Sequence, residues 1–118
     1  MTSYELSQLI HHLLDEKKAE NIVTIDLTHK AAIVDYMVIA TGTSGRQVHA
    51  LADHVSQTLK QRGHSVVAEG MPQCDWVLID AGDVWVHVFK PEARIFYNLE
   101  KMWETRDPEE GSAPILPL

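Results

Sequence analysis

Cysteine is almost absent from the sequence, in which Cys74 is the only thiol among 118 residues. A single cysteine cannot form an intrachain disulfide, and it cannot supply the cysteine sets of structural zinc sites. No apolar run approaches the roughly 20 residues that cross a bilayer. The segment 1–5 lacks the basic start of a signal peptide. We therefore expect a cytoplasmic protein without a membrane partner.

Basic residues are also scarce, since Lys and Arg number 10 against 17 Asp and Glu and the formal net charge is −7. This balance argues against broad nucleic-acid binding and favours a basic protein partner. The hydrophobic share of 45% and the charged share of 23% exclude disordered and collagen-like chains. The length suits one domain, which we assign to residues 1–104, followed by a mobile C-terminal tail over 105–118.

Hydrophobic periodicity predicts eight elements in the order helix, strand, strand, helix, three strands, helix. Thr2 and Glu5 have the spacing of a capping box, and Thr43 or Ser44 caps the second helix. The expected ranges are a helix over 2–19, strands over 22–27 and 35–41, a helix from Arg46 to Gly63, strands over 66–68, 76–79 and 84–89, and a helix from Pro91 with the apolar stripe Ile95, Phe96, Leu99, Met102 and Trp103. The fold class is therefore α/β, with a mixed sheet of about five strands and helices packed on it.

The clearest local signal is a β-hairpin formed by residues 76–79 and 84–89, in which Gly82 can supply the positive φ of a tight turn. We expect Ala81 and Gly82 to form a two-residue turn. That turn places Asp80 opposite Asp83, Leu78 opposite Trp85, and Trp76 opposite His87.

Side chains alternate across a strand, so the hairpin has two different faces. One face is aliphatic and suits a helix-covered core: Val77, Ile79, Val84, Val86 and Val88. The other face mixes aromatic and charged groups: Trp76, Leu78, Asp80, Asp83, Trp85 and His87. Large exposed indoles beside carboxylates indicate a binding surface for a basic protein. Two alternatives stay open, namely that the last helix buries both tryptophans or that a second copy of the chain covers them.

Catalytic and ligand signals are weak by comparison. The segment 42–46 lies between a strand and a helix but lacks both the P-loop lysine and the dinucleotide-binding glycine spacing, so a capped turn is the better interpretation. Among seven histidines, His49 has the carboxylate of Asp53 at helical i,i+4 spacing, but two ligands without a third do not make a good metal site. The acidic residues that could hold Mg²⁺ are Asp75, Asp80 and Asp83, while Ser44 and Cys74 have no evident base. We therefore predict no catalytic, cofactor or metal site.

Three blocks of the sequence, 35–48, 75–89 and 92–103, together resemble the ribosomal silencing factor family, also called RsfS or Iojap-like. The resemblance covers about residues 3 to 104. It implies a nucleotidyltransferase-like α/β fold that has lost catalysis. It also implies binding to protein fourteen of the large ribosomal subunit, which sterically blocks joining of the subunits when nutrients are scarce.

Carried onto this sequence, the family's contact surface falls on Trp76, Leu78 and Asp80, with the neighbouring positions Asp83, Trp85 and His87 included. Trp85 departs from the family pattern, in which a smaller aliphatic residue is usual, and this difference either enlarges the contact or moves it. The prediction is thus a non-enzymatic translational repressor. The alternatives are a nucleotidyltransferase-like enzyme that uses Mg²⁺ and a nucleotide, and a homodimer of the free protein.

Overall fold

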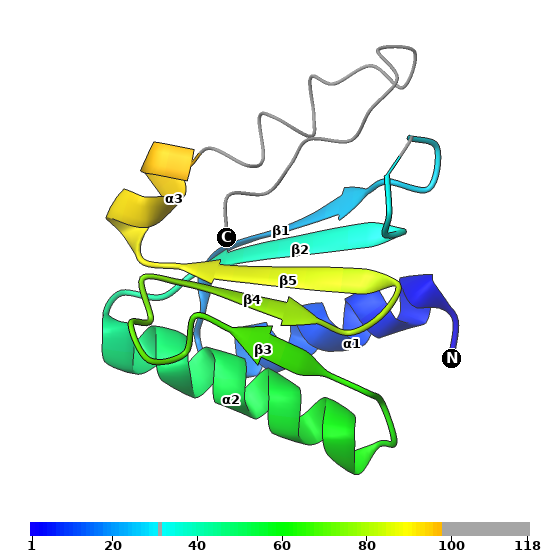
Figure 1. Ribbon diagram of the computed structural model, residues 1–118, viewed down its shortest axis with the longest axis horizontal. Coiled ribbons are helices and arrows are strands. Elements are labelled where there is room, and N and C mark those ends of the chain that lie inside the picture. Colours follow the sequence, from blue (N-terminus) through cyan, green and yellow to red (C-terminus); the bar gives the residue numbers. More distant parts are fainter. Residues whose placement is uncertain (31, 98–118) are drawn as a thin grey trace.

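The computed structural model describes residues 1–30 and 32–97, and the side chains of residues 1–30 and 32–94. Its elements follow the expected order (Figure 1). They are α1 (Ser3–Glu16), β1 (Glu20–Asp26), β2 (Tyr36–Thr41), α2 (Gly45–Gln61), β3 (Val67–Glu69), β4 (Trp76–Asp80), β5 (Val84–Phe89) and α3 (Pro91–Tyr97). The predicted α/β class is confirmed.

The strands form one five-stranded sheet in the order β1-β2-β5-β4-β3. The central pair, β2 and β5, is parallel, whereas the other three pairs are antiparallel. The sheet is therefore mixed, as the sequence predicts. β3 lies at one edge and β1 at the other, so the hairpin of β4 and β5 occupies the interior of the sheet.

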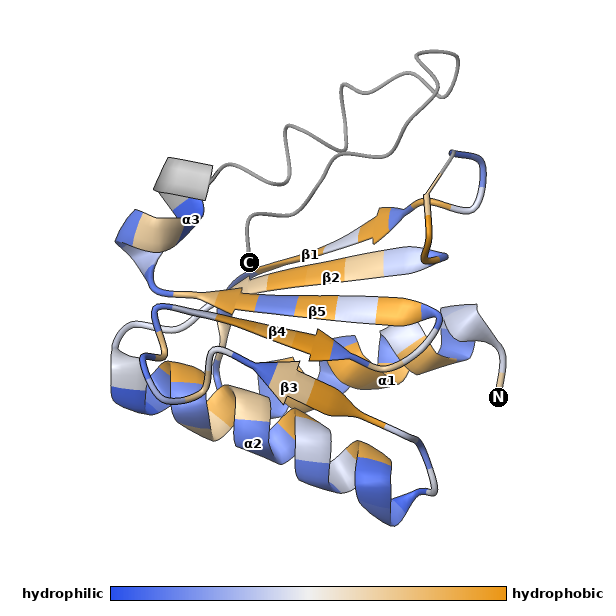
Figure 2. Cartoon of the chain, in the orientation of Figure 1, coloured by the Kyte–Doolittle hydropathy of each residue, from blue (hydrophilic) through white to orange (hydrophobic). Residues whose placement is uncertain are grey.

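One face of the sheet is covered by α1 and α2, which lie side by side beneath it in Figure 1. The main core fills this interface and includes the aliphatic face of the hairpin, in which Val77, Ile79, Val84, Val86 and Val88 are all fully buried. Figure 2 shows mainly hydrophobic residues on β4 and many hydrophilic residues on the outer side of α2. Burial of these apolar side chains is the main stabilising contribution to such a layered fold.

The helix ends follow the local signals in the sequence. The Thr2 side chain accepts from the Glu5 backbone N–H at 3.1 Å, and the Glu5 carboxylate accepts from the Thr2 N–H at 2.9 Å, which completes the predicted capping box. Ser44 caps α2 by accepting from the Gln47 N–H. Gly63, which follows α2, adopts a φ of +88°.

The predicted register of the hairpin is wrong by two residues. The structure pairs Asp80 with Trp85, Leu78 with His87, and Trp76 with Phe89. The turn is therefore centred on Gly82 and Asp83, and the Ala81 N–H donates to the Val84 carbonyl at 3.0 Å. Gly82 has a φ of +89° and takes the first central position, where two-residue turns of type II′ favour glycine. A shift of two residues preserves the two predicted faces, because side chains alternate with a period of two.

The last helix begins at Pro91, as predicted, and lies on the side of the sheet opposite α1 and α2 (Figure 1). Its Arg94 guanidinium donates to the Asn21 carbonyl and to the Thr41 hydroxyl, both at 2.6 Å, and Ala93 packs against the apolar cluster on that side. The predicted stripe at Leu99, Met102 and Trp103 and the predicted tail over 105–118 lie outside the described residues. Within the described ranges, no helix is long and apolar enough to cross a membrane.

Candidate functional site

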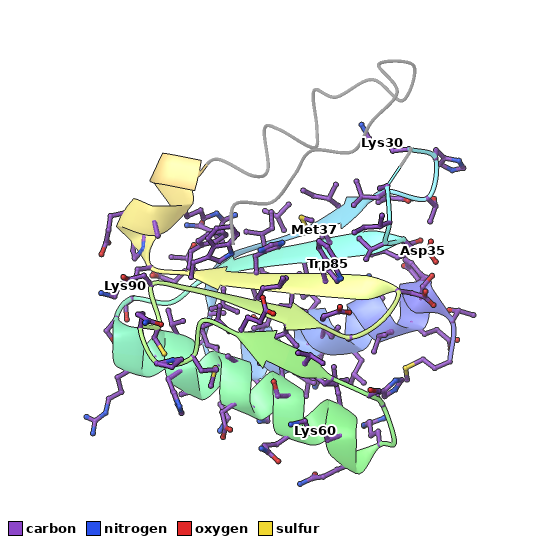
Figure 3. All side chains as sticks on the ribbon, viewed as in Figure 1. Lys30, Asp35, Met37, Lys60, Trp85 and Lys90 are labelled. Atoms are coloured by element: carbon purple, nitrogen blue, oxygen red, sulfur yellow. The ribbon has the colours of Figure 1, made fainter. Side chains whose placement is uncertain are left out.

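The candidate site lies on the far face, which is the sheet face opposite α1 and α2. The register of the strands arranges its side chains in rows that run across the sheet. One row contains Val67, Asp80, Trp85 and Met37, and the next contains Glu69, Leu78, His87 and Ile39. Figure 3 shows Met37 and Trp85 side by side on β2 and β5, on this face. Five of the six residues that the sequence predicts for the site lie in two parts of this face, and the sixth, Asp83, lies in the hairpin turn.

The first part is the aromatic stack, which consists of Trp76, His87 and Phe89. The ring centroids of Trp76 and Phe89 lie 5.1 Å apart, and those of His87 and Phe89 lie 5.9 Å apart. The Trp76 indole N–H donates to Nδ1 of His87 at 2.8 Å. These three side chains are buried, with Trp76 only 9% exposed and His87 fully covered. The expectation that the Trp76 indole is exposed is thus wrong, because its ring stacks on Phe89 and its N–H is bonded inside the fold, and its contact with a partner stays a prediction.

His87 is held as a neutral imidazole. Burial lowers its pKa from 6.5 to about 3, because a charged ring would lose its hydration. Its Nδ1 accepts the indole proton, so the ring proton lies on Nε2, an atom with no hydrogen-bond partner in the described part of the chain. The partner contact expected of His87 stays a prediction, and in the free protein the ring is fully buried and bonded to Trp76. His87 orients the Trp76 ring from within.

The second part is the Trp85 patch, which consists of Val67, Glu69, Leu78, Asp80 and Trp85. These five side chains line a pocket of about 240 Å³. Val67 is 58% exposed and Glu69 is exposed, whereas Asp80 and Trp85 are half-buried and Leu78 is nearly covered. The patch therefore presents an indole, aliphatic side chains and two carboxylates to solvent. This is the mixture that the hairpin pattern predicts, although it is centred on Trp85 and not on Trp76.

Asp83, the remaining predicted site residue, lies in the exposed hairpin turn and does not line the pocket. Its backbone carbonyl accepts from the Asp35 N–H at 2.8 Å and from the Tyr36 N–H at 3.3 Å. These bonds join the turn to the start of β2, so Asp83 positions the hairpin through its main chain.

Val67 and Glu69 are pocket residues that the sequence reasoning missed. The run 66–68 predicts a short strand, and the structure has β3 over Val67–Glu69, but only the pairing of β3 with β4 places these side chains beside Asp80 and Leu78. The sequence carries no signal for this pairing, because alternation within a run does not identify the neighbouring strand.

The turn between β2 and α2 is closed by its own side chains. Both the backbone N–H and the hydroxyl of Thr43 donate to the Gln47 side-chain oxygen, at 2.6 and 2.8 Å, and the Gln47 N–H donates to the Ser44 hydroxyl at 3.2 Å. The Thr43 and Gln47 N–H groups at this helix start are thus engaged by side chains of the same segment. This geometry supports the predicted capped turn.

The acidic residues considered for Mg²⁺ are not gathered at one point. The Asp75 carboxylate forms an ion pair with Lys90 at 3.0 Å, Asp80 lies in the Trp85 patch, and Asp83 lies in the turn. Across residues 1–30 and 32–97, no three His, Cys, Asp or Glu side chains are grouped as a metal site. Cys74 donates its thiol to the Met71 carbonyl, and burial raises the pKa of this thiol, which disfavours the reactive thiolate.

Comparison with known proteins adds independent findings. Residues 1–115 match the family model described as "Ribosomal silencing factor during starvation", RsfS. The chain is 47% identical over 111 residues to the ribosomal silencing factor RsfS of Zymomonas mobilis, covering 93% of this chain and 82% of that protein. It is 33% identical to a mouse protein named "Mitochondrial assembly of ribosomal large subunit protein 1", covering 95% of this chain and 50% of that protein. A crystal structure of a protein from Chromobacterium violaceum superposes with a TM-score of 0.85 at 39% identity, covering 92% of this chain and 91% of that one.

Proposed function

The chain belongs to the ribosomal silencing factor family, RsfS, and from that premise we propose that it represses translation in the cytoplasm by docking on the large ribosomal subunit. The proposed partner is protein fourteen, on the face of the large subunit that meets the small subunit. The bound protein then occupies space that the small subunit needs. This mechanism requires binding and excluded volume, and no chemical step.

The observation that carries this proposal is the Trp85 patch. Its indole and the exposed Val67 on β3 offer apolar area at a surface where two carboxylates are also present. Aromatic anchors surrounded by polar groups are typical of the residues that dominate binding energy at protein interfaces. Carboxylates at such a surface also favour association with basic ribosomal proteins, because complementary charge accelerates encounter.

The aromatic stack gives this patch a rigid base. Leu78 and Trp85 lie on the same two strands as Trp76, His87 and Phe89, and the buried Trp76–His87 hydrogen bond fixes the neighbouring row of side chains. A preformed surface loses less conformational entropy on binding than a flexible one. We therefore assign Trp76 and His87 to support of the contact surface, Asp80 and Trp85 to the contact itself, and the nearly covered Leu78 to the base of the pocket between them.

Cosedimentation with purified large subunits tests the proposal. Trp85→Ala is expected to weaken binding by at least about 2 kcal/mol, or roughly thirtyfold, which is typical of a central aromatic anchor. Tyr4→Ala is the matched control, since Tyr4 is an aromatic residue on α1 that is 56% exposed. Circular dichroism establishes that both variants are folded. Undiminished binding by folded Trp85→Ala protein would contradict the proposal.

Two further measurements separate this function from the alternatives. Light scattering of mixed subunits is expected to show less joining when the protein is present, and normal joining with Trp85→Ala. Calorimetry with ATP and Mg²⁺ is expected to give no heat of binding, whereas a saturable signal would favour the nucleotidyltransferase alternative. The same patch is available to a second copy of the free chain, and sedimentation velocity over a range of concentrations measures that association.

A further inference from the structure

We infer that the pocket in the Trp85 patch receives a single arginine side chain of the protein partner, an inference that rests on the docking proposed above. The pocket lies at the β3 edge of the sheet, where Val67 is 58% exposed, so it is open to a side chain that approaches from solvent.

The size of the pocket favours one side chain over a small molecule. Its volume is about 240 Å³, whereas sites for cofactors and drug-sized ligands typically have volumes of about 300 to 1,000 Å³. A nucleotide would therefore protrude from it. A long, narrow side chain with a charged end fits the same space.

The walls of the pocket match the two chemical parts of arginine. Val67 and Leu78 offer aliphatic surface to the methylene groups of the stem, which bury readily while the charged end stays in contact with polar groups. Trp85 offers an indole ring, the aromatic group that binds cations best through its face. A planar guanidinium stacks on an indole, whereas the compact ammonium of lysine does not.

The charge of the pocket also matches arginine. Glu69 and Asp80 both line it, and the ion pairs in the described ranges do not include either carboxylate. One oxygen of Asp80 accepts from the Gly82 N–H at 2.9 Å, which orients the carboxyl group before any partner arrives. A guanidinium offers several donors in a fixed plane to such oxygens. Its positive charge would be countered by two carboxylates that form no ion pair within these ranges of the free protein.

The test neutralises both carboxylates without changing their shapes. In a double variant, E69Q and D80N, the Asn amide oxygen keeps the bond to Gly82 while the negative charge is lost. We expect binding to purified large subunits to weaken about tenfold at low salt, because a charged pair at an interface loses its attraction. The slope of affinity against salt concentration is expected to be shallower than in the wild type. D53N is the matched control, since Asp53 is exposed on α2, and it should bind as the wild type does.

The outcomes distinguish this inference from the docking proposal. Loss of binding in Trp85→Ala together with wild-type affinity and salt slope in E69Q/D80N overturns the arginine inference and leaves the docking intact. Undiminished binding in Trp85→Ala overturns the docking itself.

A direct probe uses the free protein and two small compounds, Nα-acetylarginine amide and its uncharged citrulline analogue. We expect the arginine compound alone to shift the indole N–H resonance of Trp85 in NMR spectra, with saturation. This shift should vanish in E69Q/D80N. Equal shifts with the two compounds, or no shift with arginine, would overturn the inference.

Discussion

Acid should destabilise this protein through His87, a residue that no solvent reaches. Its folded pKa is about 3, well below the 6.5 of a solvated histidine, because burial disfavours the charged ring. The unfolded chain therefore binds a proton in a pH range where the folded chain does not. The contribution of His87 to the free energy of unfolding is fully present above pH 6.5 and is lost as the pH falls from 6.5 toward 3.

The size of the effect follows from the shift. Each pH unit between the two pKa values changes the free energy of unfolding by about 1.4 kcal/mol. Between pH 7 and pH 5, the contribution of His87 to stability should fall by about 2 kcal/mol. This window is chosen because the carboxyl groups of Glu5, Glu16 and Asp26, whose pKa values are lowered by hydrogen bonds, act mainly below it.

Urea unfolding at pH 7 and pH 5 measures the effect, with His87→Asn as the comparison. The Asn side-chain oxygen can accept the Trp76 indole N–H but does not titrate. We expect the wild type to lose about 2 kcal/mol more than the variant between the two pH values. Trp76→Phe, which keeps the buried histidine, should retain the pH dependence. Equal losses in the wild type and His87→Asn would refute the assignment of a buried neutral imidazole.

Other predictions concern the backbone and the helix ends. Gly70→Ala should destabilise the fold by about 2 kcal/mol or more, because an added Cβ would lie 2.2 Å from the Trp76 carbonyl oxygen and Gly70 has a φ of +92°. Gly63→Ala is its matched control, since Gly63 has a φ of +88° and no atom within 4 Å of such a Cβ, so it should lose only about 1 kcal/mol. Thermal unfolding compares the two, and equal losses would contradict the steric part of the argument. Thr2→Ala should lower the free energy of unfolding by about 1 kcal/mol, because it removes the capping box of α1. An unchanged melting temperature would show that the cap does not contribute to stability.

The sequence predicts local features of this fold well because their causes are local. The Thr2 capping box, the Ser44 cap and the start of α3 at Pro91 each depend on a few adjacent residues. The alternation of the hairpin likewise separates an aliphatic face from a mixed one, and both faces are present in the structure.

The candidate site depends on contacts that no local pattern contains. Trp76 is buried because the register pairs it with Phe89, on which its ring stacks, and its indole N–H bonds to His87. The sequence predicts a register that differs from this one by two residues, with Trp76 opposite His87. Val67 and Glu69 reach the pocket only through the pairing of β3 with β4. The mixed face was therefore predictable, but which of its indoles faces solvent was not.

The docking of the Trp85 patch on the large subunit is tested most directly by photo-crosslinking from defined positions. A photoreactive amino acid at Val67, on the exposed edge of the patch, is compared with one at Lys60, which is exposed on α2. After irradiation with purified large subunits, peptide mass spectrometry should identify protein fourteen attached to position 67 and not to position 60. Attachment of protein fourteen to position 60 alone would contradict the account.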